Sequence, residues 1–407
     1  MDAIVLAAGE GVRLRPLTST RPKPMLPVAG KPILEWDLEA LDCAKVKNVY
    51  IVVGYKADVI KSYFGGRFRG MRLHYVTQKE QLGTGDAVAQ VGNLVKGDFI
   101  VMNGDLFVTR GFISTLIRQH KRRGLEASMS LVEVKDPKSY GIVEVKGTKV
   151  VSLEEKPQKP RSNLANAGVY IFNKSIFNIL KGIGKSERME YELTDAIKKL
   201  ISGGKVSGFE CECGQWIDIG LPWNLLDANE IVLKSIPARR SSKATIEKNA
   251  HLKGDIHVGA GTIIKSGAYI EGPVYIGRNC VIGPNCHVRP YSAIMDECKV
   301  GNAVEVKNSI LMRGTHVGHL SYVGDSIIGE RCNFGAGTLV ANLRFDDDEV
   351  RIEVKNRMVK SGRRKFGCLM GDNVKTGINV SIMPGRSIYP GAYVDASSVV
   401  KNTIFTE

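Results

Sequence analysis

The chain has 407 residues, of which 43% are hydrophobic and 24% are charged. This length suits two domains of ordinary size, each able to bury its own core. The sequence contains no apolar run of membrane-spanning length, and the apolar part of its N-terminus is too short for a signal peptide. We therefore expect a cytoplasmic protein that does not act in a membrane.

The net charge is +15, from 57 basic and 42 acidic residues. A solvated basic surface and a nucleic-acid-binding surface are two ordinary explanations for such a charge. Aromatic residues are not interleaved with the basic ones and no nucleic-acid motif occurs, so we expect no nucleic acid. Small polyanions such as nucleotides, sugar phosphates and coenzyme A are the expected partners. The eight cysteines form no CxxC pair, which favours reduced thiols over a metal site.

Strands and helices alternate over the first half of the chain. Strands are predicted at residues 2–9, 46–55, 71–78 and 99–105, and helices at 33–44, 57–64, 84–94 and 112–123. In the first helix Leu34, Leu38 and Leu41 form one apolar stripe. The alternation predicts a Rossmann-like α/β domain with a mostly parallel sheet and helices on both faces. Ligands of such domains bind at the carboxyl ends of the strands.

The loop after the first strand combines glycines with cations. Gly9 and Gly11 let the backbone approach phosphates closely, but Leu14 stands where a dinucleotide motif needs its third glycine. Arg13, followed by Lys23 in RPKPMLP, suits a triphosphate better. The alternative is a proline-stiffened turn with solvated cations.

With its later blocks, this loop resembles the signature of the sugar-1-phosphate nucleotidylyltransferases. The blocks are QLGTGDA, NGDLF, YGIV, EEKP, NAGVY and WIDIG, and the match covers about the first 235 residues. The resemblance implies that Arg13 holds the leaving pyrophosphate, that Lys23 holds the reacting phosphates, and that Asp105 and Asp218 share Mg²⁺. It also implies that the nucleotide base is contacted by Gln78, Gly83 and Thr84. The sugar would be contacted by Gly141, Glu155 and Asn166. The loop glycines Gly9 and Gly11 would contribute to nucleotide binding.

Without the resemblance, the two aspartates differ in how strongly their local sequence indicates a functional role. Asp105 follows a strand in a Gly-Asp pair, which is a common turn. Asp218 is flanked by isoleucines at a strand end, so its charge needs a partner. WIDIG resembles the thymidylyl- and mannose-type enzymes, whereas bacterial uridylyl enzymes have Asn at that position. This difference does not favour UTP, which is nevertheless the substrate that we prefer, with dTTP as the alternative.

A second pattern begins after a predicted amphipathic helix at residues 222–235. Residues 236–245 are polar and basic and suit a linker. From about residue 246 to 400, and most clearly over 274–341, an aliphatic residue recurs every six positions, often followed by Gly. This period predicts a left-handed parallel β-helix of hexapeptide repeats. The predicted domains are thus 1–235 and 246–407.

Such a β-helix is either an inert scaffold or a second active site. The blocks GHLSYVGD and NFGAGT resemble the acetyltransferase domain of the bifunctional N-acetylglucosamine-1-phosphate uridylyltransferase/glucosamine-1-phosphate acetyltransferase family, of which this chain looks like an archaeal-like variant. His319 matches the general base, and histidine suits proton removal from an amine near neutral pH. His316 is interpreted as structural.

The same resemblance assigns further roles. It implies sugar-phosphate or amine contacts at Arg289, Lys307, Tyr322, Asn333, Asn342 and Lys365, and an acetyl-CoA contact at Ala336. The chain departs from the bacterial pattern by a charged insertion at residues 343–364 and by ending soon after Val400. The basic run Arg351–Lys365 either is a solvated loop or receives phosphates, and a remodelled coenzyme A site would use Arg363 and Arg364.

Together these features predict a bifunctional enzyme, expected to be a homotrimer. The β-helix domain would acetylate glucosamine-1-phosphate with acetyl-CoA, and the first domain would join the product to a nucleotide with release of pyrophosphate. Two rivals remain: a single-activity glucose- or mannose-1-phosphate nucleotidylyltransferase with a structural β-helix, and a non-catalytic regulatory subunit.

Overall fold

The computed structural model describes residues 1–124, 126–212 and 214–406. The chain forms two compact units. The first comprises Met1–Glu10, Pro22–Met25 and Ile33–Asp218, and the second comprises Gly11–Arg21, Leu26–Pro32 and Ile219–Glu407. Two short pieces of the N-terminal sequence therefore belong to the unit of the C-terminal half. No helix within the described ranges has both the length and the apolar character that crossing a bilayer requires.

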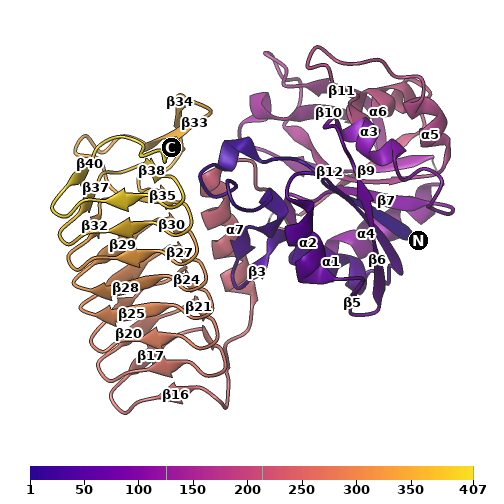
Figure 1. Cartoon of the computed structure of the whole chain (residues 1–407). Coiled ribbons are helices and arrows are strands. Elements are labelled where there is room, and N and C mark those ends of the chain that lie inside the picture. Colours follow the sequence, from indigo (N-terminus) through magenta and orange to yellow (C-terminus); the bar gives the residue numbers. More distant parts are fainter. Residues whose placement is uncertain (125, 213, 407) are drawn as a thin grey trace. The chain divides into compact units, whose positions relative to one another are not determined.

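The first unit is built on a ten-stranded mixed sheet (Figure 1). In spatial order its strands are β10 (Gly141–Lys146), β11 (Lys149–Glu155), β13 (Val206–Glu210), β9 (Ala127–Glu133), β12 (Leu164–Phe172), β7 (Phe99–Asn103), β1 (Asp2–Ala7), β4 (Asn48–Val53), β6 (Met71–Thr77) and β5 (Arg67–Phe68). Strands β7, β1, β4 and β6 run parallel, and β12 continues the sheet antiparallel to β7. A short ladder pairs β8 (Leu106–Val108) with β14 (Trp216–Asp218).

Helices cover both faces of this sheet, because successive strand residues point to opposite sides. On one side lie α1 (Ile33–Cys43), α2 (Ala57–Phe64) and α4 (Phe112–Arg123), and on the other lie α3 (Thr84–Ala89), α5 (Ser175–Leu180) and α6 (Leu193–Ser202). In β1, Val5 packs with Leu34 and Leu38 of α1, whereas Ile4 packs in the cluster that holds Val88 of α3.

The fold class predicted for this half is confirmed. The strands on which the prediction was based form the parallel centre, and antiparallel strands extend it on the β12 side. Helices α2 and α4 match their predicted bounds. The predicted helix at 84–94 is too long, since α3 ends at Ala89, close to Gly92 and Asn93. Both residues are weak helix formers.

The second unit contains a parallel β-helix with three faces, each an eight-stranded parallel sheet (Figure 1). The first face comprises β15 (Arg239–Arg240), β18 (Ile256–Val258), β21 (Val274–Ile276), β24 (Ala293–Ile294), β27 (Ile310–Leu311), β30 (Ile327–Ile328), β35 (Cys368–Met370) and β38 (Arg386–Ile388). The second comprises β16 (Thr245–Ile246), β19 (Ile263–Ile264), β22 (Val281–Ile282), β25 (Lys299–Asn302), β28 (His316–His319), β31 (Asn333–Phe334), β36 (Lys375–Thr376) and β39 (Tyr393–Val394). The third comprises β17 (His251–Lys253), β20 (Tyr269–Glu271), β23 (His287–Val288), β26 (Glu305–Lys307), β29 (Tyr322–Gly324), β32 (Leu339–Val340), β37 (Ser381–Ile382) and β40 (Val399–Val400).

The hexapeptide period explains this architecture. Ile264 pairs with Ile282, and Ile282 with Val300, so one coil takes three hexapeptides. Each of these side chains is fully buried and stacks on its counterpart in the next coil. The predicted left-handed parallel β-helix is therefore confirmed as the fold of the repeat region. Strand β15 lies inside the segment predicted as a linker and is the first strand of its face.

Cysteines occupy interior positions of the coils. Cys280, Cys298 and Cys332 are buried, and burial raises the pKa of Cys280 to about 11 and that of Cys332 to about 12. These groups remain thiols at neutral pH and act as small apolar side chains. Cys211 is also a buried free thiol, and Cys213 lies outside the described residues.

Two further elements complete the second unit. Helix α7 (Pro222–Ser235) has its predicted bounds. The insertion contains an antiparallel hairpin of β33 (Arg351–Val354) and β34 (Arg357–Lys360). Its turn residues Lys355 and Asn356 have φ angles of 51° and 59°, as a type I′ turn requires. Ile352 is fully buried, so the insertion is a packed element and the solvated-loop interpretation is wrong for this part.

Candidate functional site

Three predicted residues of the first unit gather where β7 ends. Asp105 lies in the turn between β7 and β8, and Asp218 of β14 pairs with Leu106, the residue after Asp105. The Lys23 ammonium lies 2.6 Å from Asp105 Oδ2. Lys23 is only 5% exposed, so the turn-with-solvated-cations interpretation is wrong for this lysine.

Asp105 and Asp218 fit a magnesium ion. Asp105 Oδ1 is buried and makes no hydrogen bond within the described residues, which leaves it available to a cation. Mg²⁺ is commonly held by one or two carboxylates together with substrate phosphates. Among the described residues no group of three or more His, Cys, Asp or Glu side chains is placed so that it could hold a metal ion. Two carboxylates are therefore the protein ligands that the first unit offers at this point.

A third acidic residue lies close by and was missed in the sequence. Asp37 of α1 is fully buried, and neither of its carboxylate oxygens has a hydrogen-bond partner within the described ranges. Burial, together with the negative charge of Asp105, raises the pKa of Asp37 well above its ordinary value. The signal was present in the pattern, because Asp37 falls on the Leu34–Leu38–Leu41 stripe, where a charge is unexpected.

The residues predicted to face the base meet at the start of α3. Gln78 is 5% exposed and donates from Nε2 to the Gly83 carbonyl at 3.1 Å and to Asp86 Oδ2 at 2.7 Å. A Cβ on Gly83 would lie 2.6 Å from the Tyr191 carbonyl, so only glycine fits there. The Thr84 hydroxyl accepts a hydrogen bond from Leu193 N, which gives Thr84 a structural duty as well.

The three residues predicted to line the sugar pocket also come together. Gly141 and Glu155 are directly paired across β10 and β11. A Cβ on Gly141 would lie 2.8 Å from Glu155 Oε2 and 3.8 Å from the Asn166 Cβ. Asn166 donates to the Tyr170 hydroxyl at 2.7 Å and accepts from Gly168 N at 3.1 Å. Its side chain is thereby held in one orientation.

The loop glycines and Arg13 are divided between the units. Gly9 lies in the first unit's share of the loop, which ends at Glu10, and a Cβ added to Gly9 would meet no atom within 4 Å. Gly11, with φ 68°, begins the second unit's share and precedes the exposed Arg13 in a short 3-10 helix (Val12–Leu14). The Thr18 hydroxyl donates to the Gly11 carbonyl at 2.9 Å.

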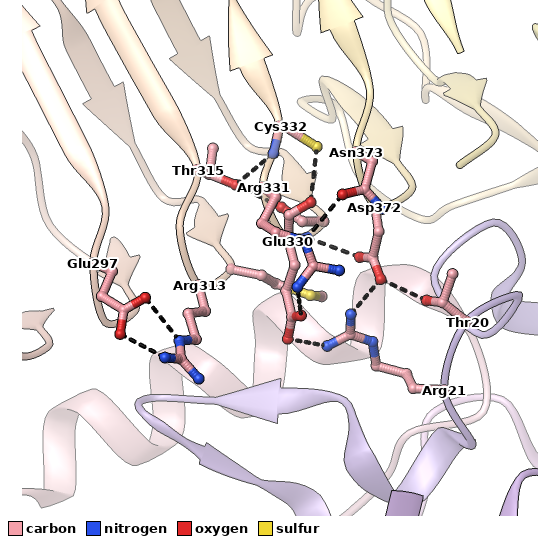
Figure 2. Close-up of polar contacts among 12 residues, drawn as sticks. Thr20, Arg21, Glu297, Arg313, Thr315, Glu330, Arg331, Cys332, Asp372 and Asn373 are labelled. Atoms are coloured by element: carbon pink, nitrogen blue, oxygen red, sulfur yellow. Dashed lines mark hydrogen bonds and ion pairs between the residues drawn. The ribbon is translucent and has the colours of Figure 1, made fainter. Parts of the chain in front are cut away.

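Polar contacts bind this part of the loop to the β-helix. Figure 2 shows the Arg21 guanidinium between Glu330, at 2.6 Å, and Asp372, at 2.5 Å. The Thr20 hydroxyl donates to the same Asp372 oxygen at 2.6 Å. Asp372 is 4% exposed and also accepts from Glu330 N, so both acids are preorganised for the arginine. These contacts explain why residues 11–21 belong to the second unit.

On the third face of the β-helix, predicted substrate residues surround a buried carboxylate. Asp325, 4% exposed, accepts from Asn342 Nδ2 at 2.5 Å and lies 3.4 Å from Lys307 Nζ. Asn342 also donates to the Tyr322 hydroxyl at 3.0 Å. Burial and the Asp325 charge raise the pKa of Tyr322. Asp325 was missed as an individual residue, although it stands inside the quoted GHLSYVGD block.

Two other cations lie beside this cluster. Arg289 Nη1 is 2.9 Å from Glu305 Oε1, and Glu305 is the lateral neighbour of Tyr322 in the ladder. Lys365 is exposed, and its backbone forms an isolated antiparallel β-bridge with Leu343. Next to it, Phe366 N donates to the Asn342 carbonyl. The insertion thus leaves and rejoins the β-helix at one point and places Lys365 next to Asn342.

His319 ends strand β28, and its side chain is exposed, as is that of His316 at the start of the same strand. Gly337 N donates to the His319 carbonyl at 3.3 Å, which brings the Ala336–Gly337 segment to the coil above. Ser321 Oγ donates to the same carbonyl, one corner before Tyr322. Asn333 instead lies beside His316, at the other end of the strand.

The two arginines proposed for coenzyme A are both ion-paired. Arg363 Nη1 lies 2.5 Å from Asp227 Oδ1 of α7, and Arg364 Nη2 lies 2.8 Å from Asp347 Oδ1. Arg363 therefore has a structural partner within its unit, whereas Arg364 is on the exposed side of the insertion.

Comparisons with known proteins agree with this geometry. Residues 2–235 match the family model described as nucleotidyl transferase, and residues 270–404 match the model described as GMPPB C-terminal domain. A Bacillus anthracis crystal structure in complex with sucrose, described as a glucose-1-phosphate thymidylyltransferase, superposes with a TM-score of 0.54 at 26% identity. The match covers 59% of this chain and 98% of that one.

Full-length relatives are closer. The bifunctional protein GlmU of Methanocaldococcus jannaschii is 46% identical over 99% of this chain and 96% of its own length. The bifunctional sugar-1-phosphate nucleotidylyltransferase/acetyltransferase of Sulfurisphaera tokodaii is 42% identical over 97% of both chains. A glucose-1-phosphate thymidylyltransferase of Streptomyces griseus is 34% identical over 81% of this chain and 92% of its own. Since the most similar of these relatives match along both units, this chain belongs to the family of bifunctional sugar-1-phosphate nucleotidylyltransferase/acetyltransferase enzymes.

Proposed function

We propose that the chain makes a nucleotide-activated N-acetylhexosamine in two steps at two separate sites. The β-helix acetylates glucosamine-1-phosphate with acetyl-CoA. The α/β unit then joins N-acetylglucosamine-1-phosphate to the nucleotidyl group of UTP, or alternatively of dTTP, and releases pyrophosphate. The observation that carries the proposal is that one chain combines the Lys23–Asp105–Asp218 group with the Lys307–Tyr322–Asn342 cluster.

In the nucleotidyl transfer, an oxygen of the sugar phosphate attacks the α-phosphorus and pyrophosphate leaves in line. Charge grows on the phosphoryl oxygens, so catalysis depends on positioning and on cations. Lys23, held by Asp105, supplies a fixed positive charge, and Arg13 holds the leaving pyrophosphate. Asp105 and Asp218 would hold Mg²⁺, which when bound neutralises phosphate charge. Gly9 and Gly11 admit the phosphates, Gln78, Gly83 and Thr84 position the base, and Gly141, Glu155 and Asn166 position the sugar.

In the acetyl transfer, the amine of glucosamine-1-phosphate attacks the thioester carbonyl of acetyl-CoA. The C–N bond forms as the C–S bond breaks, His319 takes the proton from the amine, and the coenzyme leaves as its thiol. Arg289, Lys307, Tyr322 and Lys365 hold the phosphate, Asn333 and Asn342 contact the sugar or amine, and Ala336 contacts the coenzyme. Because Asn333 and Asn342 lie on different faces of the β-helix, we include a homotrimer, with acetyl-transfer sites at subunit boundaries, in the proposal.

The domain bounds 1–235, 236–245 and 246–407 remain part of this proposal. The rival is a single-activity nucleotidylyltransferase whose β-helix is only a scaffold. The Streptomyces griseus relative and the match to the GMPPB C-terminal domain are the observations on its side. The full-length relatives described as bifunctional favour two activities instead.

Mass spectrometry of the purified chain with acetyl-CoA and glucosamine-1-phosphate separates the two. The expected product is heavier by one acetyl group, and it should be lost in His319→Ala. His316→Ala, on the same strand and equally exposed, is the matched control and should retain the product. Pyrophosphate release from UTP and N-acetylglucosamine-1-phosphate without any acetylated sugar would establish the scaffold rival.

A further inference from the structure

A cavity of about 240 Å³ lies in the second unit and is used by neither proposed reaction. It is lined by Val12, Arg15, Glu353, Lys355, Asn356, Ser387, Tyr389 and Thr403. These residues come from the 3-10 segment of the N-terminal loop, the tip of the β33–β34 hairpin, strand β38 with the residue after it, and the C-terminal segment. Figure 1 shows the C-terminal end beside this hairpin.

The lining contains an unused hydrogen-bonding group. Ser387 is 2% exposed, and its Oγ makes no hydrogen bond within the part of the chain that the structure describes. A buried hydroxyl without a partner is unfavourable, because it has lost its hydrogen bonds to water and gained none in the protein. A ligand that accepts or donates one hydrogen bond at this point would remove that cost.

The residues that line the cavity include two cations and one acid. Arg15 and Lys355 are cationic and exposed at the rim. Glu353 is the only acid among the lining residues, and it already accepts from the Thr403 hydroxyl at 2.5 Å. Two cations at one rim suit a phosphomonoester dianion. The hydroxyl, amide and carboxylate groups, at Ser387, Tyr389, Asn356 and Glu353, suit a ligand that also has hydroxyl groups.

The site is also built on packed elements. The hairpin is fixed by Ile352, which is fully buried, and by the contact of Gly385 with the Arg351 carbonyl, where a Cβ would come within 2.2 Å. Its turn holds Lys355 and Asn356 in left-handed conformations, so both are displayed on a rigid tip. The wall of the cavity that the hairpin forms is therefore fixed by packing.

We propose that this cavity binds a hydroxylated phosphomonoester of about monosaccharide size. Arg15 and Lys355 hold the phosphate, while Ser387 Oγ and Glu353 hydrogen-bond to hydroxyl groups. The volume of about 240 Å³ is below the range of about 300–1,000 Å³ for drug-sized ligands, which favours a sugar phosphate over a nucleotide sugar. Val12 and Arg15 lie on either side of Arg13 in the chain, so an occupant contacts residues on both sides of Arg13. We therefore expect the rate of nucleotidyl transfer to change when the cavity is occupied. This expectation rests on the proposed function, in which Arg13 holds the pyrophosphate.

Calorimetric titration of the full chain with glucose-6-phosphate tests the site. Binding is expected in the wild type and should weaken at least tenfold in Lys355→Asn, which removes the cation and tolerates the left-handed turn. Ser387→Ala should weaken it several-fold without lowering the melting temperature. Arg357→Ala, on the same hairpin but outside the cavity, is the control and should bind as the wild type does.

Three results would overturn the assignment: no binding at millimolar glucose-6-phosphate, equal binding by glucose, or loss of binding in Asp105→Asn or His319→Ala. The last would place the probe in a reaction site. The link to Arg13 is tested separately, by pyrophosphate release with and without the probe. A rate that changes in the wild type but not in Lys355→Asn supports it, and an unchanged rate despite binding overturns it. Absence of pyrophosphate release in all samples would instead contradict the proposed nucleotidyl transfer.

Discussion

The two units place their candidate site residues in different ways. In the α/β unit several of these residues have structural partners of their own, such as Lys23 on Asp105 and Thr84 on Leu193, and Lys23, Gln78 and Gly141 are buried. In the β-helix most of them stand on outward ladder positions, as His319 and Asn333 do, while the repeat fills the inward ones. A repeat fixes its core and leaves its outer surface free to vary. We therefore expect mutations of buried, partnered residues such as Lys23 and Gln78 to affect fold and function together, and mutations at outward positions of the β-helix to affect function alone.

The largest effect is expected from Asp105→Asn. This change removes a charge from the candidate metal site and the partner of Lys23, so nucleotidyl transfer should fall by about a hundredfold or more. Acetyl transfer should be unaffected. Initial rates of both reactions on the same preparation provide the measurement. Equal loss of the two activities would contradict the separation of the sites.

The next effect compares two neighbouring isoleucines of β19. Ile264 is fully buried in the β-helix and Ile263 is 38% exposed on its outer surface. Ile264→Ala should lower the free energy of unfolding by about 2–5 kcal/mol, because it leaves a cavity in the stacked core. Ile263→Ala should cost less than about 1 kcal/mol. Urea unfolding followed by fluorescence measures the free energy of unfolding of both variants. Similar losses of stability would contradict the conclusion that the inward-facing residues alone form the core.

Gly141→Ala should act on substrate binding more than on folding. The new Cβ would come within 2.8 Å of Glu155 Oε2, so the Glu155 side chain must move from the sugar pocket. We expect KM for the sugar phosphate to rise about fivefold to tenfold, or about 1–1.4 kcal/mol, with kcat little changed. Gly182→Ala is the control, since its Cβ finds only ordinary contacts. An unchanged KM would remove Gly141 and Glu155 from the sugar site.

A last prediction concerns the pH dependence of stability that Asp37 causes. Its raised pKa means that the native state holds a proton that the unfolded state releases, so its contribution to stability is complete below the ordinary Asp pKa and is lost as pH rises towards the native pKa. The wild type should therefore lose up to about 1.4 kcal/mol per pH unit in that window relative to Asp37→Asn. Melting temperatures between pH 4 and 8 provide the comparison. Parallel curves for the two proteins would show that Asp37 does not hold a proton in the native state.

Local patterns predicted the regular parts of the fold well. Helices α2, α4 and α7 have their predicted bounds, and the six-residue period led directly to the stacking of Ile264 on Ile282. The type I′ hairpin of the insertion was missed, because Lys355–Asn356 is not one of the usual glycine-containing turn pairs.

Long-range contacts could not be predicted from local patterns. The assignment of residues 11–21 to the second unit depends on Arg21 meeting Glu330 and Asp372, more than 300 positions away. Asp325 and Asp37 are defined by what surrounds them once the chain has folded. For the candidate sites, the resemblance supplied residue identities, and the structure added which of them lie in contact.

Mixing two single-site variants tests the central claim, that one chain contains two independent active sites. Asp105→Asn and His319→Ala are each incubated with glucosamine-1-phosphate, acetyl-CoA, UTP and Mg²⁺, alone and together. We expect almost no UDP-N-acetylglucosamine from either variant alone and substantial product from the mixture, because the acetylated intermediate passes from one protein to the other. A mixture as inactive as its parts, although each variant keeps its native fold, would contradict the two-site account.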